Sequence, residues 1–316
     1  MIRDVVVVGA SLAGLRAVES LRTSGFDGRI TVIGAEPYLP YDRPPLSKRL
    51  LSGEWEVDRI ALRKQADMQS LDVTWRLGSV AVDLDHEARR IHLDDGASVE
   101  FEGAIVATGW RGRELPGQRD LPAVVTLRTV DDALALRARL IGGGRRVVVI
   151  GAGFIGLEVA ATARTLGNEV LVLESAPVPL ARSLGSMMGG AVAAVHADHG
   201  VEVRCNAVIE GLVDGAVLTD GGWHEQADVV VVGIGVDPAT DWLAASGLEV
   251  RDGLVCAPDL NVGVPLIYGA GDMVRWYNAA FDEEMRVEHW TNAAEQGALA
   301  ASNLLAEATQ QPTTPY

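Results

Sequence analysis

Two glycine-rich segments have the residue types and the spacing that bind the pyrophosphate of a dinucleotide. They are Gly9-Ala-Ser-Leu-Ala-Gly14 and Gly151-Ala-Gly-Phe-Ile-Gly156. In such a turn the first glycine permits a tight bend, the second lets the backbone approach the phosphates, and the third lets helix and strand pack closely. Free N–H groups at the start of the helix then hold the anion. Ser11 replaces the second glycine of the first copy, and its side chain is small enough to keep that approach open.

In each copy an acidic residue also lies after the strand that follows the helix. A carboxylate there can accept hydrogen bonds from ribose hydroxyls. In the second copy this residue is Glu174, which would also repel a 2′-phosphate, so NAD is favoured over NADP. Arg182, eight residues later, could soften that discrimination. Glu36 is the nearest acid in the first copy. The alternative for Glu174 is a solvated acid at the end of a strand.

Both turns lie between predicted elements that occur in the same order. The pattern predicts a strand over 5–8, a helix from Leu15 to about Ser24 and a strand over 29–33, then a strand over 147–150, a helix ending near Leu166 and a strand over 169–173. Strand, glycine turn, helix, strand and acid therefore appear twice. We interpret this as a duplicated β-α-β dinucleotide-binding unit of the α/β class.

Each copy is followed by short apolar segments with turn signals, which predict a β-meander crossover. These segments are 79–84, 88–93 and 99–107 in the first half, with Asp95-Gly96 as a hairpin turn, and 201–205, 208–213, 216–218 and 229–233 in the second half. Each series ends on a strand that closes on glycine, at Gly109 and at Gly235. With linkers near 110–122 and 235–247, we predict one domain from 1–112 and 246–316 and a second, inserted domain over 113–245.

Length, charge and composition exclude several classes of function. The chain has 316 residues, which is enough for two domains. Its net charge of −16 argues against a nucleic-acid partner, because phosphate binding needs basic patches. The longest apolar runs are too short for a membrane span, and no signal peptide is expected before the strand that starts near Asp4. Only Cys205 and Cys256 are present, so a reducing cytoplasm fits, and no metal site is predicted.

Two further segments bear on a flavin. Tyr268-Gly-Ala-Gly-Asp272 ends an apolar strand with glycines and one carboxylate, which can hydrogen-bond a ribityl hydroxyl; a plain turn is the alternative. Flavoprotein disulfide reductases carry redox cysteines at the flavin, but Tyr41-Asp-Arg-Pro-Pro-Leu-Ser-Lys48 contains none. Cys205 and Cys256 fit better as small buried residues. Thiol chemistry is therefore disfavoured.

Taken together, these segments resemble the FAD-dependent NADH:ferredoxin reductases of bacterial oxygenase systems. The markers are VVVVGASLAGLRAVESLR, YDRPPLSK, IVATG, LRTVDDA, VVVIGAGFIGLEVAATARTLG, GIGVDP, YGAGDM and EHWTNAAEQG, and they cover essentially the whole chain. This group includes the putidaredoxin-reductase-like and rhodocoxin-reductase-like proteins of the pyridine nucleotide-disulfide oxidoreductase superfamily. The resemblance implies a glutathione-reductase-like fold with two Rossmann-like domains, of which the first binds FAD and the inserted one binds NAD.

The resemblance also implies roles for individual residues. For FAD they are Gly9, Ser11, Leu12, Ala13, Gly14, Glu36, Arg43, Lys48, Val80, Ala107, Thr108, Gly109, Arg128, Gly271, Asp272, His289 and Trp290. For NAD they are Gly153, Phe154, Ile155, Gly156, Glu174, Arg182 and Gly235. Lys48, Glu158 and Trp290 are the expected catalytic residues. The alternatives are a surface lysine for Lys48, an acid on a helix face for Glu158, and a core tryptophan for Trp290.

The implied reaction is hydride transfer from NADH to FAD, followed by single-electron transfer to a [2Fe–2S] ferredoxin that feeds a cytochrome P450 or a ring-hydroxylating oxygenase. The alternatives are a rubredoxin reductase, an NADH oxidase, or a flavoprotein that senses NADH and passes no electrons on. Family members usually carry a third, C-terminal β-rich domain, and this chain stops at Gln311–Tyr316, where that domain would begin. The resemblance implies that this third domain helps to shape the exposed face of the flavin and the docking site of the acceptor.

Overall fold

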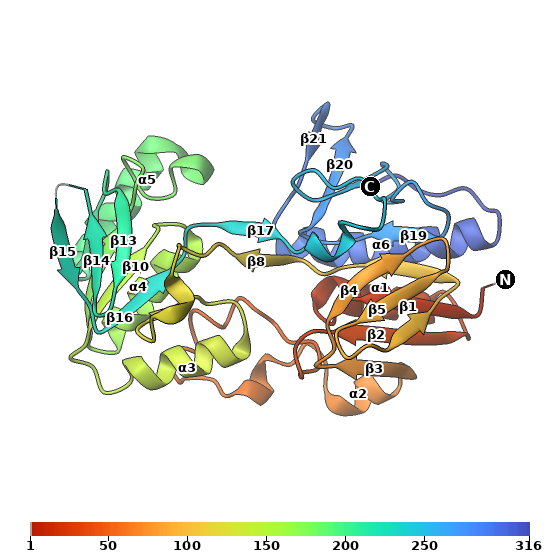
Figure 1. The fold of residues 1–316 in the computed structure, drawn as a ribbon, viewed down its shortest axis with the longest axis horizontal. Helices are drawn as coiled ribbons and strands as arrows, with labels where there is room; N and C mark the ends of the chain where they lie inside the picture. The colour runs from red at the N-terminus through yellow and green to blue at the C-terminus, as the bar shows by residue number, and fades with distance from the viewer. Residues whose placement is uncertain (1, 221) are drawn as a thin grey trace. The chain divides into compact units, whose positions relative to one another are not determined.

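The computed structural model describes residues 2–220 and 222–316, and the chain forms two compact units (Figure 1). The first unit contains residues 1–42, 61–110 and 238–316, and the second contains residues 43–60 and 111–237. Within the described residues, no helix combines the length and the apolar character needed to cross a membrane.

A five-stranded parallel sheet forms the core of the first unit, in the order β19-β7-β1-β2-β3. The strands are β1 (Asp4–Val8), β2 (Arg29–Gly34), β3 (Val73–Leu77), β7 (Gly103–Val106) and β19 (Ile267–Gly269). Val5–Val8 is buried along its whole length, which is typical of a central strand covered on both faces. The predicted strands at 5–8 and 29–33 are confirmed, paired in parallel with Val5 opposite Ile30.

Two long helices lie side by side against this sheet (Figure 1). Helix α1 (Leu12–Thr23) begins inside the first glycine-rich segment, earlier than the predicted Leu15, and α6 (Trp290–Ala308) contacts it. Gly297 makes the close approach possible, because a Cβ there would lie 2.2 Å from the carbonyl oxygen of Ala13. The short helix α2 (Gln65–Gln69) precedes β3.

A separate three-stranded meander follows β3, as predicted. It consists of β4 (Ala81–Asp85), β5 (Arg90–Leu93) and β6 (Ser98–Glu100), paired antiparallel. The hairpin turn at Asp95-Gly96 is confirmed, with Gly96 at φ +82°. The prediction of one strand over 99–107 is wrong: β6 belongs to the meander and β7 to the parallel sheet. Buried Phe101 lies at the change of sheet, and the alternation of apolar residues with Glu100 and Glu102 continues across it and hides the break.

The remaining strands of the first unit come from the C-terminal third of the chain. They are β18 (Leu254–Cys256), β20 (Val274–Asn278) and β21 (Glu283–Met285), which form a small sheet of their own in the order β18-β20-β21. The loop between β19 and β20 contains Gly271 and Asp272. Residues 238–316 group with the first unit.

The second unit repeats the plan of the first. Its parallel sheet has the order β12-β11-β10-β16-β9, from β9 (Val124–Val125), β10 (Arg146–Ile150), β11 (Glu169–Leu173), β12 (Val201–Arg204) and β16 (Val229–Val232). Its helices are α3 (Val130–Leu140), α4 (Phe154–Thr165) and α5 (Ala181–Asp198). Helix α4 begins inside the second glycine-rich segment, and it ends next to Leu166, as predicted.

The meander of the second unit differs from the prediction in two respects. It consists of β13 (Ile209–Val213), β14 (Ala216–Thr219) and β15 (Trp223–Gln226). The segments 201–205 and 229–233, predicted to belong to it, instead contribute β12 and β16, which pair in parallel with β11 and β10. Strand β15 was not predicted, because its residues, Trp-His-Glu-Gln, lack an apolar alternation.

The two connecting segments pair with each other. Strand β8 (Trp110–Gly112) and strand β17 (Val236–Pro238) form a two-stranded ribbon at the boundaries of the units. The units divide at 110/111 and 237/238, and the domain bounds at 112/113 and 245/246 stay a prediction. Residues 43–60, which we expected in the first domain, pack with the second unit. Which unit serves which cofactor stays a prediction.

Candidate functional site

The first glycine turn has a geometry that only glycine permits. Gly9 has φ +124°, and a Cβ there would lie 2.1 Å from the carbonyl oxygen of Ala107. A Cβ at Gly14 would lie 1.9 Å from the carbonyl oxygen of Gly9. The N–H group of Gly9 donates to the carbonyl of Ile33 at 2.8 Å. The first glycine turn is therefore held tightly between β7, β2 and the start of α1, as the binding of a pyrophosphate requires.

The start of α1 offers backbone N–H groups to an anion. Ser11 is the N-cap residue, with an extended backbone, and within the described chain its hydroxyl makes no capping hydrogen bond to this helix. Leu12, Ala13 and Gly14 form the first turn and are buried. No acidic side chain from this turn competes for its N–H groups. The positive end of the helix dipole and these groups suit a phosphate.

Three further segments of the first unit that carry predicted flavin contacts lie outside its glycine turn. Glu36 follows β2 and accepts a hydrogen bond from the Tyr41 hydroxyl. Thr108, after β7, donates through its hydroxyl to the carbonyl of Ala239 at 2.7 Å, and its neighbour Gly109 has φ +70°. Val80, whose side chain is exposed, donates its N–H to Asp94 at 3.0 Å.

The loop after β19 lies against the first turn of α1. Gly271 has φ +83°, and a Cβ there would lie 3.1 Å from the Cβ of Ala13. Its N–H donates to the buried side chain of Gln296 at 2.9 Å. The tertiary structure thus brings Asp272, the residue after Gly271, to the end of the sheet that carries the first glycine turn. This proximity supports a nucleotide-binding role for 268–272 over a plain turn.

His289 and Trp290 lie where α6 begins. His289 is the N-cap residue, and its Nδ1 accepts from the N–H of Thr291 at 3.2 Å. The Trp290 indole N–H donates to Asp42 at 3.0 Å. Trp290 is 42% exposed, so the alternative of a core tryptophan is wrong. An exposed indole tethered by its N–H can contact a ligand.

The second glycine turn repeats the geometry of the first. Gly151 has φ +98°, and a Cβ there would lie 2.3 Å from the carbonyl oxygen of Gly233, while one at Gly156 would lie 2.1 Å from the carbonyl oxygen of Gly151. Gly153 differs, because a Cβ there meets no described atom within 4 Å. The structure therefore gives Gly151 and Gly156 a role in the fold, and it leaves the space beside Gly153 open for a ligand.

Glu174 lies at the end of β11, directly beside this second turn. One carboxylate oxygen accepts from the N–H of Ala152 at 2.6 Å, and the other accepts from the N–H of Ala176 at 2.8 Å. The carboxylate is thus fixed between the glycine turn and the following loop. Arg182 lies in the first turn of α5 and is exposed, as is Phe154 in the first turn of α4, whereas Ile155 is half-buried. Gly235, at φ +105°, follows β16.

Lys48 and Glu158 form an ion pair within the second unit. Lys48 Nζ lies 2.6 Å from Glu158 Oε2, and the Ser47 hydroxyl donates to the same oxygen. The buried Thr162 hydroxyl donates to the Ser47 carbonyl at 2.8 Å. The segment that carries Lys48 is therefore attached to two successive turns of α4, and Glu158 is more than a solvated acid on a helix face.

The predicted flavin residues are divided between the two units. Arg43, Lys48 and Arg128 group with the second unit, where the Arg43 guanidinium donates to the Arg128 carbonyl at 2.7 Å. The other predicted flavin residues lie in the first unit. For all of them, contact with FAD stays a prediction.

Several side chains that shape the site were not predicted. Ser47 and Thr162 hold Lys48 and Glu158, while Tyr41 and Gln296 hold Glu36 and Gly271. Ser47 and Tyr41 lie inside the YDRPPLSK segment, which could have drawn attention to them. Thr162 and Gln296 lie on helices and contact residues far away in the sequence, so no local signal reveals them.

The two cysteines are free thiols. Cys256 is buried in the first unit, and burial raises the pKa of its thiol far above the ordinary value. Cys205 is half-buried rather than buried as expected, and burial, followed by the negative charge of Glu174, raises the pKa of its thiol as well. A raised pKa keeps a thiol protonated and poorly nucleophilic.

Comparison with known proteins agrees with this geometry. The family model described as pyridine nucleotide-disulphide oxidoreductase matches residues 3–297. Rhodocoxin reductase of Rhodococcus erythropolis is 37% identical over 99% of this chain and 74% of its own length. The ferredoxin–NAD(+) reductase component of the anthranilate 1,2-dioxygenase system of Burkholderia cepacia is 39% identical over 95% of this chain and 75% of its own.

A solved structure gives the same result for the fold. The chain superposes on the structure of the covalent putidaredoxin reductase–putidaredoxin complex with a TM-score of 0.93 and 31% identity. The match covers 100% of this chain and 78% of the solved chain.

Proposed function

Because this chain belongs to the pyridine nucleotide-disulphide oxidoreductase family, we propose that it is an FAD-dependent NADH:ferredoxin oxidoreductase. The observation that carries the proposal is the duplicated cradle: two glycine turns of matching geometry, each at the start of a helix of 12 residues and each followed by an acid. One cradle accounts for one dinucleotide. Two cradles fit an enzyme that binds FAD and NAD(H) together.

We assign FAD to the first unit and NAD(H) to the second. Glu36, Gly271 and Asp272 lie with the first cradle, in keeping with the longer set of contacts that a flavin needs. When bound, FAD accepts a hydride from NADH and passes electrons on one at a time. The chain supplies the positioning: the helix starts hold the pyrophosphates, and Glu36 and Glu174 are the ribose acceptors.

The proposed acceptor is a [2Fe–2S] ferredoxin that serves a cytochrome P450 or a ring-hydroxylating oxygenase. Relatives at 31–39% identity are named as ferredoxin–NAD(+) reductases or as reductases of a redox partner protein. A second candidate is a rubredoxin acceptor, since a rubredoxin–NAD(+) reductase of Pseudomonas putida is 34% identical over 98% of this chain. A cytoplasmic location belongs to the same proposal, and the two free thiols fit a reducing compartment.

Anaerobic stopped-flow spectroscopy with NADH tests this proposal. We expect the flavin absorbance to bleach rapidly and an added [2Fe–2S] ferredoxin to be reduced faster than an added rubredoxin. Bleaching without electron transfer to either protein would favour a flavoprotein that senses NADH. A protein that binds no FAD would refute the proposal.

Exchange of both cysteines should leave electron transfer intact. The Cys205→Ser, Cys256→Ala double variant is expected to reduce ferredoxin within about twofold of the wild-type rate, because both thiols have raised pKa values and so little thiolate. Steady-state ferredoxin reduction measures this. A large loss in a variant that still binds FAD and melts normally would mean that a thiol carries electrons.

Preference for NADH should depend on Glu174. In Glu174→Gln, the charge that would repel a 2′-phosphate is removed, and one ribose acceptor is weakened. We expect the ratio of kcat/KM for NADH to that for NADPH to fall roughly tenfold or more. The matched control is Glu169→Gln, at the other end of β11, which should leave the ratio unchanged. An unchanged ratio in Glu174→Gln would show that this carboxylate does not distinguish the ribose of NADH from that of NADPH.

A further inference from the structure

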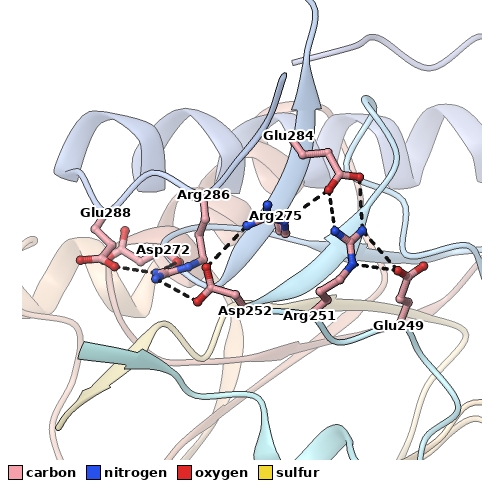
Figure 2. A network of polar contacts seen from close by, with 8 residues as sticks. All are labelled: Glu249, Arg251, Asp252, Asp272, Arg275, Glu284, Arg286 and Glu288. Atoms are coloured by element: carbon pink, nitrogen blue, oxygen red, sulfur yellow. Dashed lines mark hydrogen bonds and ion pairs between the residues drawn. The ribbon is translucent and has the colours of Figure 1, made fainter. Parts of the chain in front are cut away.

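Three arginines and several carboxylates form a network beside β18, β20 and β21 (Figure 2). Arg251 pairs with Glu249 and Glu284, and Arg275 pairs with Glu284 and Asp252. These contacts join side chains on the small sheet and its flanking loops. Such exposed pairs usually contribute little to stability.

Arg286 differs from the other two arginines in what it contacts. Its Nη1 donates to the backbone carbonyl of Asp272 at 3.0 Å and to Glu288 at 2.7 Å, while its Nη2 lies 3.6 Å from Asp252. Only 11% of its side chain is exposed. Figure 2 shows the guanidinium between Asp272, Asp252 and Glu288. Of these arginines, Arg286 is the one for which a hydrogen bond to the loop after β19 is seen in the described chain.

The backbone makes room for this side chain. Gly253 has φ +126°, and a Cβ there would lie 2.6 Å from the Met273 carbonyl oxygen and 3.0 Å from Cδ of Arg286. A larger residue at this position would push Arg286 away from Asp272. Close packing at both ends of the arginine therefore fixes where its guanidinium lies.

Arg286 also connects two segments that are far apart along the β19–α6 stretch. Asp272 lies in the loop after β19, and Arg286 is three residues before His289, the N-cap residue of α6. A planar guanidinium with several donors can hold a carbonyl and two carboxylates in one arrangement, which a flexible ammonium cannot do equally well. Without the guanidinium, the Asp272 loop and the start of α6 could move independently of each other.

We propose that Arg286 is a positioning residue for the flavin: it fixes the Asp272 loop and the start of α6 in the arrangement that FAD binds. The inference rests on the proposed function, in which the first unit, with Asp272, binds FAD, and on the prediction that His289 and Trp290 contact the flavin. Arg286 itself acts through Asp272. Its loss should therefore weaken FAD binding more than it weakens the fold.

The test measures the FAD dissociation constant of the apoprotein by quenching of flavin fluorescence. In Arg286→Gln the side chain keeps part of its stem but is too short to reach Asp272, and we expect FAD to bind roughly ten- to hundredfold more weakly. Arg286→Lys, which keeps the charge, should recover part of the affinity. The matched control is Arg251→Gln, from the same network, which should bind FAD within about twofold of the wild type.

Thermal unfolding of each apoprotein shows whether a loss of FAD affinity comes from a less stable fold. The Asp272→Ala variant tests separately whether FAD binds at this loop. Wild-type affinity in Arg286→Gln, with a loss in Asp272→Ala, would overturn the role of Arg286 and leave the FAD site in place. Wild-type affinity in both would overturn the assignment of FAD to this loop. Equal losses in Arg286→Gln and Arg251→Gln would overturn the inference too, because the network would then act only through general stability. The visible circular dichroism of the bound flavin should change in Arg286→Gln and not in Arg251→Gln.

Discussion

Replacing Lys48 with alanine is expected to slow the reduction of bound FAD by NADH roughly 100-fold, a typical loss when one preorganised charge-stabilising group is removed from an active site. We propose that Lys48 supplies this positive charge. Its ammonium is held 2.6 Å from Glu158, and the adjacent Ser47 is hydrogen-bonded to the same carboxylate and to Thr162. The cation is thus preorganised, and it needs little rearrangement when reduction adds negative charge to the flavin.

Single-turnover stopped-flow reduction by NADH, followed at the flavin absorbance band, measures this effect. Glu158→Gln should give a smaller loss, since it leaves the lysine charge in place and removes only its partner. The control is Arg49→Ala, which removes the neighbouring basic side chain, whose guanidinium stacks on Trp55 at 4.7 Å. Wild-type reduction in Lys48→Ala would mean that Lys48 is an ordinary surface lysine.

The second large effect should come from valine at the last glycine of the second turn. At Gly156 the added Cβ would lie 2.1 Å from the backbone oxygen of Gly151. The backbone of Gly151 cannot move away without a large energetic cost. We therefore expect Gly156→Val to lower the unfolding free energy by about 3 kcal/mol or more. Thermal unfolding should show a clearly lower Tm, together with a loss of NADH binding.

Valine at Gly153 tests the same turn without a clash. A Cβ there meets no described protein atom within 4 Å, and φ is −77°, which any residue tolerates. Gly153→Val should therefore melt within a few degrees of the wild type, while its KM for NADH rises roughly tenfold or more, because the side chain occupies the space that the pyrophosphate needs.

A serine at the same position completes the comparison. Gly153→Ser copies Ser11 of the first turn and should bind NADH better than Gly153→Val does. If Gly153→Val keeps a wild-type KM for NADH, the second cradle does not hold the pyrophosphate. If Gly156→Val melts normally, the close approach of α4 to β10 is not required for the fold.

Much of this arrangement follows from local sequence. The glycine turns, the apolar strands before them and the acids after them lie within about 30 consecutive residues, which is the length of one β-α-β unit. Backbone rules determine such a unit: only glycine accepts φ +124° at Gly9, and a run such as Val147–Ile150 is stable only when both faces are buried. The two cradles and Glu174 could therefore be predicted from the sequence.

Boundaries between sheets could not be predicted in this way. The alternation of apolar and acidic residues through Phe101 continues from β6 towards β7. Val201–Arg204 looks like a meander strand although it pairs with β11. Side-chain alternation tells which face of a strand is buried. It does not tell which neighbouring strand will pair with it, since that choice depends on partners far away in the sequence.

Only tertiary contacts determine which side chains hold the site residues in place. Ser47 reaches Thr162 and Glu158 across more than 100 residues, so residues 43–60 pack with the second unit although the chain order places them in the first. Arg286 reaches Asp272 through space that Gly253 leaves open. Local patterns determine which groups can bind a dinucleotide, because backbone conformation is local. Which side chains hold those groups in place depends on long-range packing, and only the folded chain provides it.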